Sequence, residues 1–204
     1  MTKRTKPITA GELRAKLLAD PEWVARERER DRVQSERVAL SRIEQEPILK
    51  ELHSIGYDLN SVWDFVNTAK VYESAIPILI KHLQLPYSDG IRGGIARSLA
   101  VREAQYAWPT LVEAYCREPY HKRVPGTLLM QEAKDGLAVA LAATATDAVI
   151  EELIALAKDR SHGESRILLL RPLKKSKSPI AKMALVELAS DPDLKKEIAS
   201  WRKK

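Results

Sequence analysis

The chain has 204 residues, 30% of them charged and 5% aromatic, and its formal net charge at pH 7 is +6. This length suits one domain with a sizeable core and an extension, while the single cysteine, Cys116, excludes an intramolecular disulfide and favours a reducing compartment. Because no apolar run approaches the roughly 20 residues of a membrane span and the polar N-terminus lacks a signal-peptide core, we expect a cytoplasmic protein without membrane contact.

Residues 1–46 are expected to form a basic tail followed by a charged helical arm. Thr9 and Glu12 have the spacing of a capping box, which predicts a short first helix. Asp20 and Pro21 then supply an N-cap and a first-turn proline for a second helix that runs to the end of this segment. Bases and acids alternate over most of its surface, so we expect it to be solvated or to dock by a narrow apolar stripe.

The composition changes at Pro47, where a helical repeat domain spanning residues 47–204 is predicted to begin. Residues 47–69 are expected to form a helical pair that covers the open end of the repeats. The first helix of this pair carries an apolar stripe, and Ser61 and Asp64 have capping-box spacing at the start of the second.

The stretch 75–100 predicts two short amphipathic helices around a tight turn. Apolar residues recur at helical spacing in 76–83 and again in 91–99, and residues 86–90 between them are typical of a turn. Pro77 falls in the first turn of the first helix, where its missing N–H leaves no helical bond unmade. Small residues in the second helix predict a close approach to a neighbouring helix.

Three further copies of this unit follow along the chain. They are 107–115 with 133–141, 149–157 with 165–173, and a weaker copy, 180–188 with 194–201. Leu79, Leu111 and Leu153 occupy the same position on successive first helices, so we expect them to be buried between units. Pro172 is expected to interrupt the second helix of the third unit.

A helix pair that recurs every thirty to forty-odd residues is typical of an α-solenoid, because each pair buries its apolar stripe only by stacking on the next. Over about residues 70–201 the pattern resembles the HEAT-repeat family. The resemblance is carried by the apolar positions, by a proline in the first helix (Pro77, Pro109) and by a base at the start of the second (Arg92, Lys134, Arg166). It implies an all-α solenoid of stacked antiparallel helix pairs.

The resemblance also implies a protein-interaction scaffold whose second helices line a concave surface. Five bases would then project into or beside this surface and bind an acidic partner: Arg92, Arg97, Lys134, Arg166 and Arg171. A base fixed at a repeat position more often pairs with an acid or carbonyl of a neighbouring unit, so an intramolecular role for these residues stays open.

The excess of positive charge lies in residues 171–204, which include the basic run Lys174 to Lys177. Such a segment suits acidic partners or phosphates. Solvated basic ends are also commonplace in helical proteins, so this run alone does not define a site.

Two other classes of function stay open. HEAT-like DNA-repair glycosylases grip a nucleic-acid backbone in their concave groove, and Trp63, Trp108 and Tyr115 are aromatic candidates for such a site. In residues 47–170 the acids slightly outnumber the bases, which favours a protein partner over nucleic acid. The third class is an enzyme-accessory role like that of HEAT-like chromophore lyases, for which no residue here is specific.

The sequence contains no pattern for catalysis, metal binding or cofactor binding. The 4 histidines lie in different units, without HExxH or Cys-pair spacing. The glycines of residues 90–94 do not follow a predicted strand, so they do not fit a dinucleotide-binding loop, and no Walker-type lysine occurs. We therefore expect no catalytic residue, no metal and no cofactor, and favour a non-enzymatic role.

Overall fold

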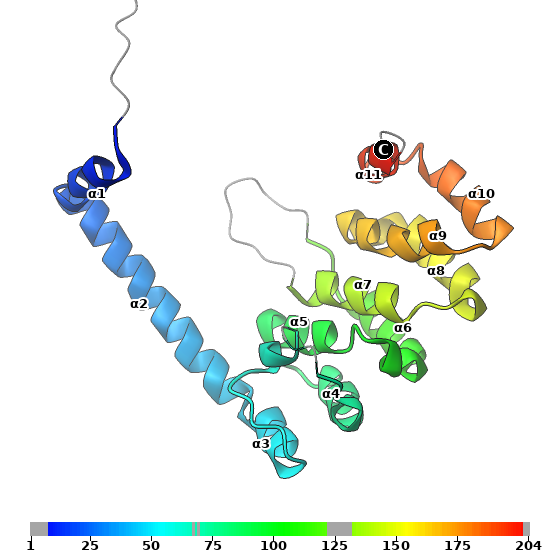
Figure 1. The fold of residues 1–204 in the computed structure, drawn as a ribbon, viewed down its shortest axis with the longest axis horizontal. Helices are drawn as coiled ribbons and strands as arrows, with labels where there is room; N and C mark the ends of the chain where they lie inside the picture. The colour runs from blue at the N-terminus through cyan, green and yellow to red at the C-terminus, as the bar shows by residue number, and fades with distance from the viewer. Residues whose placement is uncertain (1–7, 67, 69, 122–131, 202–204) are drawn as a thin grey trace, which may run out of the picture. The chain divides into compact units, whose positions relative to one another are not determined.

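The computed structural model describes residues 8–66, 68, 70–121 and 132–201 (Figure 1). Every regular element in these residues is a helix, which confirms the all-α prediction. The chain separates into two compact units, with the boundary between Glu44 and Gln45. The predicted N-terminal tail, residues 1–7, lies outside the described residues. None of the helices described is both long enough and apolar enough to cross a membrane.

The first unit contains α1 (Ala10–Leu18) and α2 (Pro21–Glu44). The predicted capping box is confirmed, because the Thr9 side chain accepts a hydrogen bond from the Glu12 backbone while the Thr9 N–H donates to the Glu12 carboxylate, at 2.9 Å. The carboxylate of Asp20 accepts from two backbone N–H groups in the first turn of α2. Neither helix contains a fully buried residue, so this unit has no core of its own.

The second unit is a succession of short helices. Its α-helices are α3 (Glu46–Ser54), α4 (Ile76–Leu83), α5 (Asp89–Ser98), α6 (Trp108–Arg117), α7 (Glu132–Thr144), α8 (Ile150–Lys158), α9 (Leu170–Lys175), α10 (Pro179–Leu188) and α11 (Lys195–Ser200). Stretches of 3-10 helix lie between them: η1 (Val62–Phe65), η2 (Glu73–Ala75), η3 (Arg102–Ala107), η4 (Asp147–Val149) and η5 (Arg160–Leu169). A proline occupies the first or second position of α3, α4, α6 and α10, where a backbone donor has no helical partner.

Helices of the second unit contact one another in a regular order. α4 contacts α5, α6 contacts α7 and α8 contacts η5, while α5 also contacts α7 and α7 contacts η5. Beyond them α10 packs on α8 and α9, in the yellow-to-orange part of the ribbon (Figure 1). Leu79, Leu111 and Leu153 are all 0% exposed, which confirms the prediction that these three leucines are buried.

The contact between α5 and α7 is unusually close because glycines face it. A Cβ atom on Gly93 would lie only 2.6 Å from the backbone carbonyl carbon of Glu132, and one on Gly136 would lie 2.8 Å from the oxygen of Gly93. Asp89 of α5 also accepts hydrogen bonds from the first two backbone N–H groups of α7, at 2.9 and 3.0 Å. The small residues of the predicted second helix thus permit a close helix contact, as expected.

The second helix of the third unit begins differently from the prediction. It consists of η5, which contains a kink at Gly163 with φ of 58°, followed by α9 from Leu170. Pro172 lies in the first turn of α9, and the helix continues past it to Lys175. The kink therefore has its cause in the backbone of Gly163, and Pro172 is a residue of the restarted helix.

Candidate functional site

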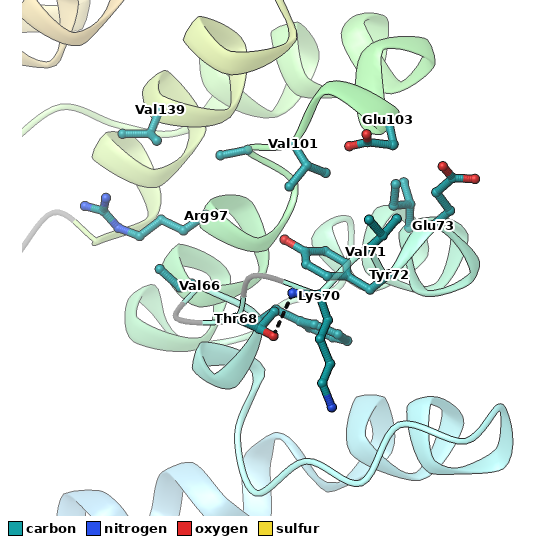
Figure 2. Close-up of a pocket in the computed structure, with 13 residues that line it drawn as sticks. Val66, Thr68, Lys70, Val71, Tyr72, Glu73, Arg97, Val101, Glu103 and Val139 are labelled. Atoms are coloured by element: carbon teal, nitrogen blue, oxygen red, sulfur yellow. Dashed lines mark hydrogen bonds between the residues drawn. The ribbon is translucent and has the colours of Figure 1, made fainter.

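Two pockets adjoin on the surface of the second unit. The first has a volume of about 440 Å³ and lies between the segment that follows η1 and the end of α5 (Figure 2). The second has a volume of about 910 Å³ and lies between α7 and α9. Ala100 and Val139 line both pockets, so the two pockets are neighbours, and together they are called the groove below.

The floor of the groove is apolar and is made of short side chains. α7 contributes Val139, Ala142 and Ala143, of which Ala143 is exposed and the other two are half-buried. Ala100 and Leu168 add to the same apolar lining. Because these side chains are short, the backbone of a bound segment can approach α7 closely while its aliphatic groups cover the floor.

One wall of the second pocket is positively charged. It carries Arg171, Lys175 and Lys177, called the basic pole below. None of these three bases forms an ion pair with an acid among the described residues. The acid that lines this pocket, Asp147, accepts a hydrogen bond from the hydroxyl of Ser176 at 2.7 Å. The basic pole therefore presents charge that the protein itself does not offset by an ion pair.

The first pocket has mixed charge. Figure 2 shows Glu73 and Glu103 on one side of it, and Arg97 and Val139 on the other. The Nε atom of Arg97 lies 4.0 Å from a carboxylate oxygen of Glu132, which is a weak ion pair, and 29% of the Arg97 side chain is exposed. Since Val139 also lines the second pocket, Arg97 adds a further base on the side nearer that pocket.

Three of the residues that line the groove share one position of the predicted repeat. In the register of the second helices predicted above, Arg97, Val139 and Arg171 are equivalent, five residues after Arg92, Lys134 and Arg166 respectively. All three of the later residues line the groove. Of the five bases predicted for the site, the structure thus brings Arg97 and Arg171 to this surface.

Lys134 is directed inward instead. Only 1% of it is exposed, and its Nζ atom donates to the backbone carbonyls of Tyr115 at 2.6 Å and Glu118 at 2.8 Å. The same atom lies 3.0 Å from Nδ1 of His162 and 4.0 Å from the centre of the Tyr115 ring. Burial lowers the pKa of Lys134, but each of its three donors has an acceptor.

Arg166 is also internal, with 0% exposure. Its guanidinium donates to the backbone carbonyls of Gly163 and Ala157, at 2.8 and 3.2 Å. It further bonds both carboxylate oxygens of Asp191, at 3.0 and 3.3 Å, and reaches Asp193 at 2.9 Å. Burial opposes ionisation of Asp191, but hydrogen bonds from Arg166 and from the Asp193 backbone outweigh it, so the pKa of Asp191 is lowered.

The side chains of Arg92, Lys134 and Arg166, which share one position of the predicted repeat, therefore make their contacts within the chain. Lys134 reaches carbonyls at the C-terminal end of α6, and Arg166 reaches one at the end of α8, where carbonyls have no helical donor. Arg92, which is half-buried, forms an ion pair with Glu118. For these three bases, the structure describes the intramolecular pairing that the sequence analysis left open.

The described residues contain few of the side-chain arrangements that metal binding and nucleophilic catalysis require. They contain no cluster of His, Cys, Asp and Glu that could hold a metal ion. The Nε2 atom of His162 is buried without a hydrogen-bond partner, with an Asp159 carboxylate oxygen 3.7 Å away. Desolvation raises the pKa of Cys116, so this thiol lacks the lowered pKa of a reactive cysteine.

None of the three aromatic candidates for stacking on nucleic-acid bases is fully exposed. Tyr115 and Trp108 are buried, and Trp63 is half-buried against the core. The Nε1–H of Trp108 donates to the carboxylate of Glu152. These contacts leave little of the two buried rings for an external base.

Comparison with family models, with curated proteins and with solved structures finds no match to this chain. The site is therefore defined by its geometry alone. Arg97 and Arg171 were selected from the sequence, whereas the floor residues Ala142 and Ala143 were not. The signal for them is that they lie on the side of α7 away from its buried residues.

Proposed function

We propose that the second unit is a protein-interaction module built as a HEAT-like α-solenoid. Support comes from the order of contacts, in which α5, α7 and η5 follow one another as a layer of second helices. Burial of Leu79, Leu111 and Leu153 at one repeat position supports the same arrangement of the first helices. Stacked pairs of this kind form extended surfaces that bind other macromolecules.

In this proposal the groove is the surface that binds the partner. The observation that carries it is the combination of an apolar floor around Val139 with a basic pole that has no ion-pair partner in the described part of the chain. Protein interfaces commonly join an apolar centre to a charged rim. The uncompensated bases favour a partner surface that carries acids.

Nucleic acid is the less favoured partner. A groove for single strands usually combines bases with exposed aromatic rings, whereas Trp108 and Tyr115 are buried in this protein. Glu73 and Glu103 at the first pocket would also repel a phosphate backbone.

The proposal can be tested by site-specific photo-crosslinking in the cells that make the protein. A crosslinking amino acid replaces Ala143 on the groove floor, and a matched variant carries it at Ala155, an exposed alanine of α8 that lines neither pocket. We expect a discrete crosslinked protein from position 143 and none from position 155. The captured protein, once purified, should bind the unmodified chain and lose binding to the Ala143→Glu variant but not to Ala155→Glu.

Equal crosslinking from the two alanines, or a captured protein that binds the Ala143→Glu variant normally, would contradict a role for the groove. Both substitutions place a carboxylate near the C-terminal end of a short helix, so their effects on helix stability are matched. A difference between them in binding therefore reports the surface and not the helix.

A further inference from the structure

We propose that the groove holds an acidic peptide segment of its partner, with aliphatic side chains on the floor and carboxylates over the basic pole. This inference rests on the proposed function of the same groove. It assigns the chemistry of the bound segment and the direction in which its charges lie.

Some exposed bases of the second unit form ion pairs and others, such as Lys182 and Lys196, form none with the described residues. The basic pole differs from both groups because its three bases line one pocket. Lys81 lies 2.6 Å from a carboxylate oxygen of Glu51, and Lys158 lies 2.5 Å from one of Glu187, although these pairs are exposed. The three bases of the pole are also exposed, yet they have no such partner in the ranges that the structure describes. Like charges held on one wall repel one another, and a bound carboxylate relieves this repulsion.

Neighbouring groups do not supply that carboxylate. Asp147 is the acid that lines the second pocket, and its Oδ1 atom accepts the hydrogen bond from Ser176. Lys174, next in sequence to Lys175, places its Nζ atom 4.5 Å from the centre of the Trp201 ring and so belongs to a different contact. Asp147 forms no ion pair with the pole, so the three bases of the pole can bind an external anion.

A difference in charge between the two pockets gives the bound segment a direction, because the first pocket is lined by two bases, Lys70 and Arg97, and two acids. Glu73 and Glu103 lie at the first pocket, on the side away from Arg97 and Val139 (Figure 2). The first pocket therefore offers an acidic end no net attraction, whereas the basic pole of the second pocket attracts it. We therefore expect acids at one end of the segment and neutral or basic residues at the other.

The shape of the floor favours a peptide over a small anion. A pocket of about 910 Å³ that adjoins another of about 440 Å³ has room for several residues. Its floor offers Ala142, Ala143 and Leu168, which can bury aliphatic groups but offer no side-chain hydrogen bond. Affinity thus needs both an apolar part and an acidic part in the same ligand.

The test is a selection from a phage-displayed random peptide library on the purified full chain. Selected peptides are measured against Arg171→Glu/Lys175→Glu, which reverses the pole, and against Lys182→Glu/Lys196→Glu, which makes the same change of net charge at exposed sites outside the groove. We expect enrichment of acidic, aliphatic peptides that bind the pole variant at least about tenfold more weakly and the control variant unchanged. Peptides whose acids are replaced by lysine should regain binding to the pole variant, which also shows that this variant is folded.

Each other result has a defined meaning. Peptides without acids that bind the pole variant normally, but lose binding to Ala143→Glu, would overturn the acidic ligand and leave the groove as a binding surface. Failure to enrich any peptide, or enrichment of peptides indifferent to both the pole and Ala143 variants, would overturn the inference together with the proposed function.

Discussion

Lys134 and His162 form a buried hydrogen bond, and its geometry determines the protonation state of His162. Lys134 has only donors, so the Nδ1 atom of His162, 3.0 Å away, must act as acceptor. His162 is therefore neutral, with its proton on Nε2, the atom that lies 3.7 Å from the Asp159 carboxylate. A second proton on the imidazole would place two positive charges next to each other inside the protein.

This pair predicts a loss of stability in mildly acid solution. Burial, and then the charge of Lys134, lower the pKa of His162 from 6.5, whereas the unfolded chain titrates near that value. Between the lowered pKa and 6.5 the unfolded state binds more protons, so the free energy of unfolding decreases as the pH falls through this window and levels off below it. Urea unfolding between pH 7.5 and 5 should show this decrease, and the His162→Gln variant should show a smaller one.

A control for this measurement is the same substitution at His53, an exposed histidine of α3. It distinguishes the effect of removing any histidine from the effect of removing the buried Lys134–His162 pair. A pH dependence that is identical in the original chain and in the His162→Gln variant would show that His162 does not control it.

Lys134 and Arg166 occupy equivalent positions of the predicted repeat, and each has about as many hydrogen-bond donors as there are acceptors around it. Lys134 has three donors and three acceptors, two carbonyls and one imidazole nitrogen. Arg166 has five donors in a planar fork, and it meets two carbonyls and two carboxylates. Removing either side chain would leave buried polar atoms without partners, which is a large cost in a protein interior.

At the scale of the helices, the glycines of α5 provide a matched test of the α5–α7 contact. A methyl group on Gly93 would collide with the backbone of Glu132, whereas one on Gly90 meets nothing within 4 Å. We expect Gly93→Ala to destabilise the protein by about 1–3 kcal/mol, the usual range for overpacking, because backbone has to move. Gly90→Ala should be neutral or stabilising, by up to about 1 kcal/mol, since alanine favours the helix.

Urea denaturation of the two variants is the measurement. Equal effects at the two glycines would mean that α5 and α7 do not approach as closely as described. The comparison is informative because both residues belong to one helix and undergo the same change, so helix propensity alone predicts the same sign for both.

Much of the helical architecture follows from local patterns in the sequence. The capping box at Thr9 and the burial of Leu79 depend on neighbours a few residues away, and both were predictable. The kink at Gly163 was not, because its φ of 58° is a backbone state that a glycine permits but does not require.

The direction of the repeated bases was also contained in the sequence, in the angles of an α-helix. At about 100° per residue, Lys134 lies about 60° from Leu137 and about 20° from Leu141, which are buried. It is therefore on the inner side of α7, whereas Val139 lies about 160–200° from the same two leucines. What the sequence does not contain is the partner of each base, since Asp191 is 25 residues from Arg166.

On the scale of the whole molecule, the two units are stabilised by different interactions. The first has no buried residue, and its ion pairs, such as Arg32 with Glu29 and Glu36, are exposed. Pairs of this kind contribute only a few tenths of a kcal/mol each. The second unit has a continuous apolar core that extends from Ile48 to Ile198. Cooperative unfolding is therefore expected from the second unit.

Charge distribution over the second unit also bears on the prediction that nucleic acid is not the partner. Phosphate binding is driven largely by counterion release, so its affinity falls with salt by a log–log slope of roughly 0.7–0.9 for each phosphate contacted. A ligand held by an apolar floor and a few charges should respond less. Glu73 and Glu103 at one end of the groove shorten any basic track, and Lys134 and Arg166 are buried.

We therefore predict that the purified chain binds neither DNA nor RNA more tightly than the non-specific range of about 10⁻⁴–10⁻⁶ M at physiological salt. A shift assay over a series of salt concentrations is the measurement. Because Arg171 and Lys175 of the basic pole are exposed, their reversal to glutamate would weaken any phosphate binding that occurs through the groove. Nanomolar, steeply salt-dependent binding that this double substitution abolishes would make nucleic acid the ligand of the groove, since an acidic peptide and a phosphate backbone would then compete for the same bases.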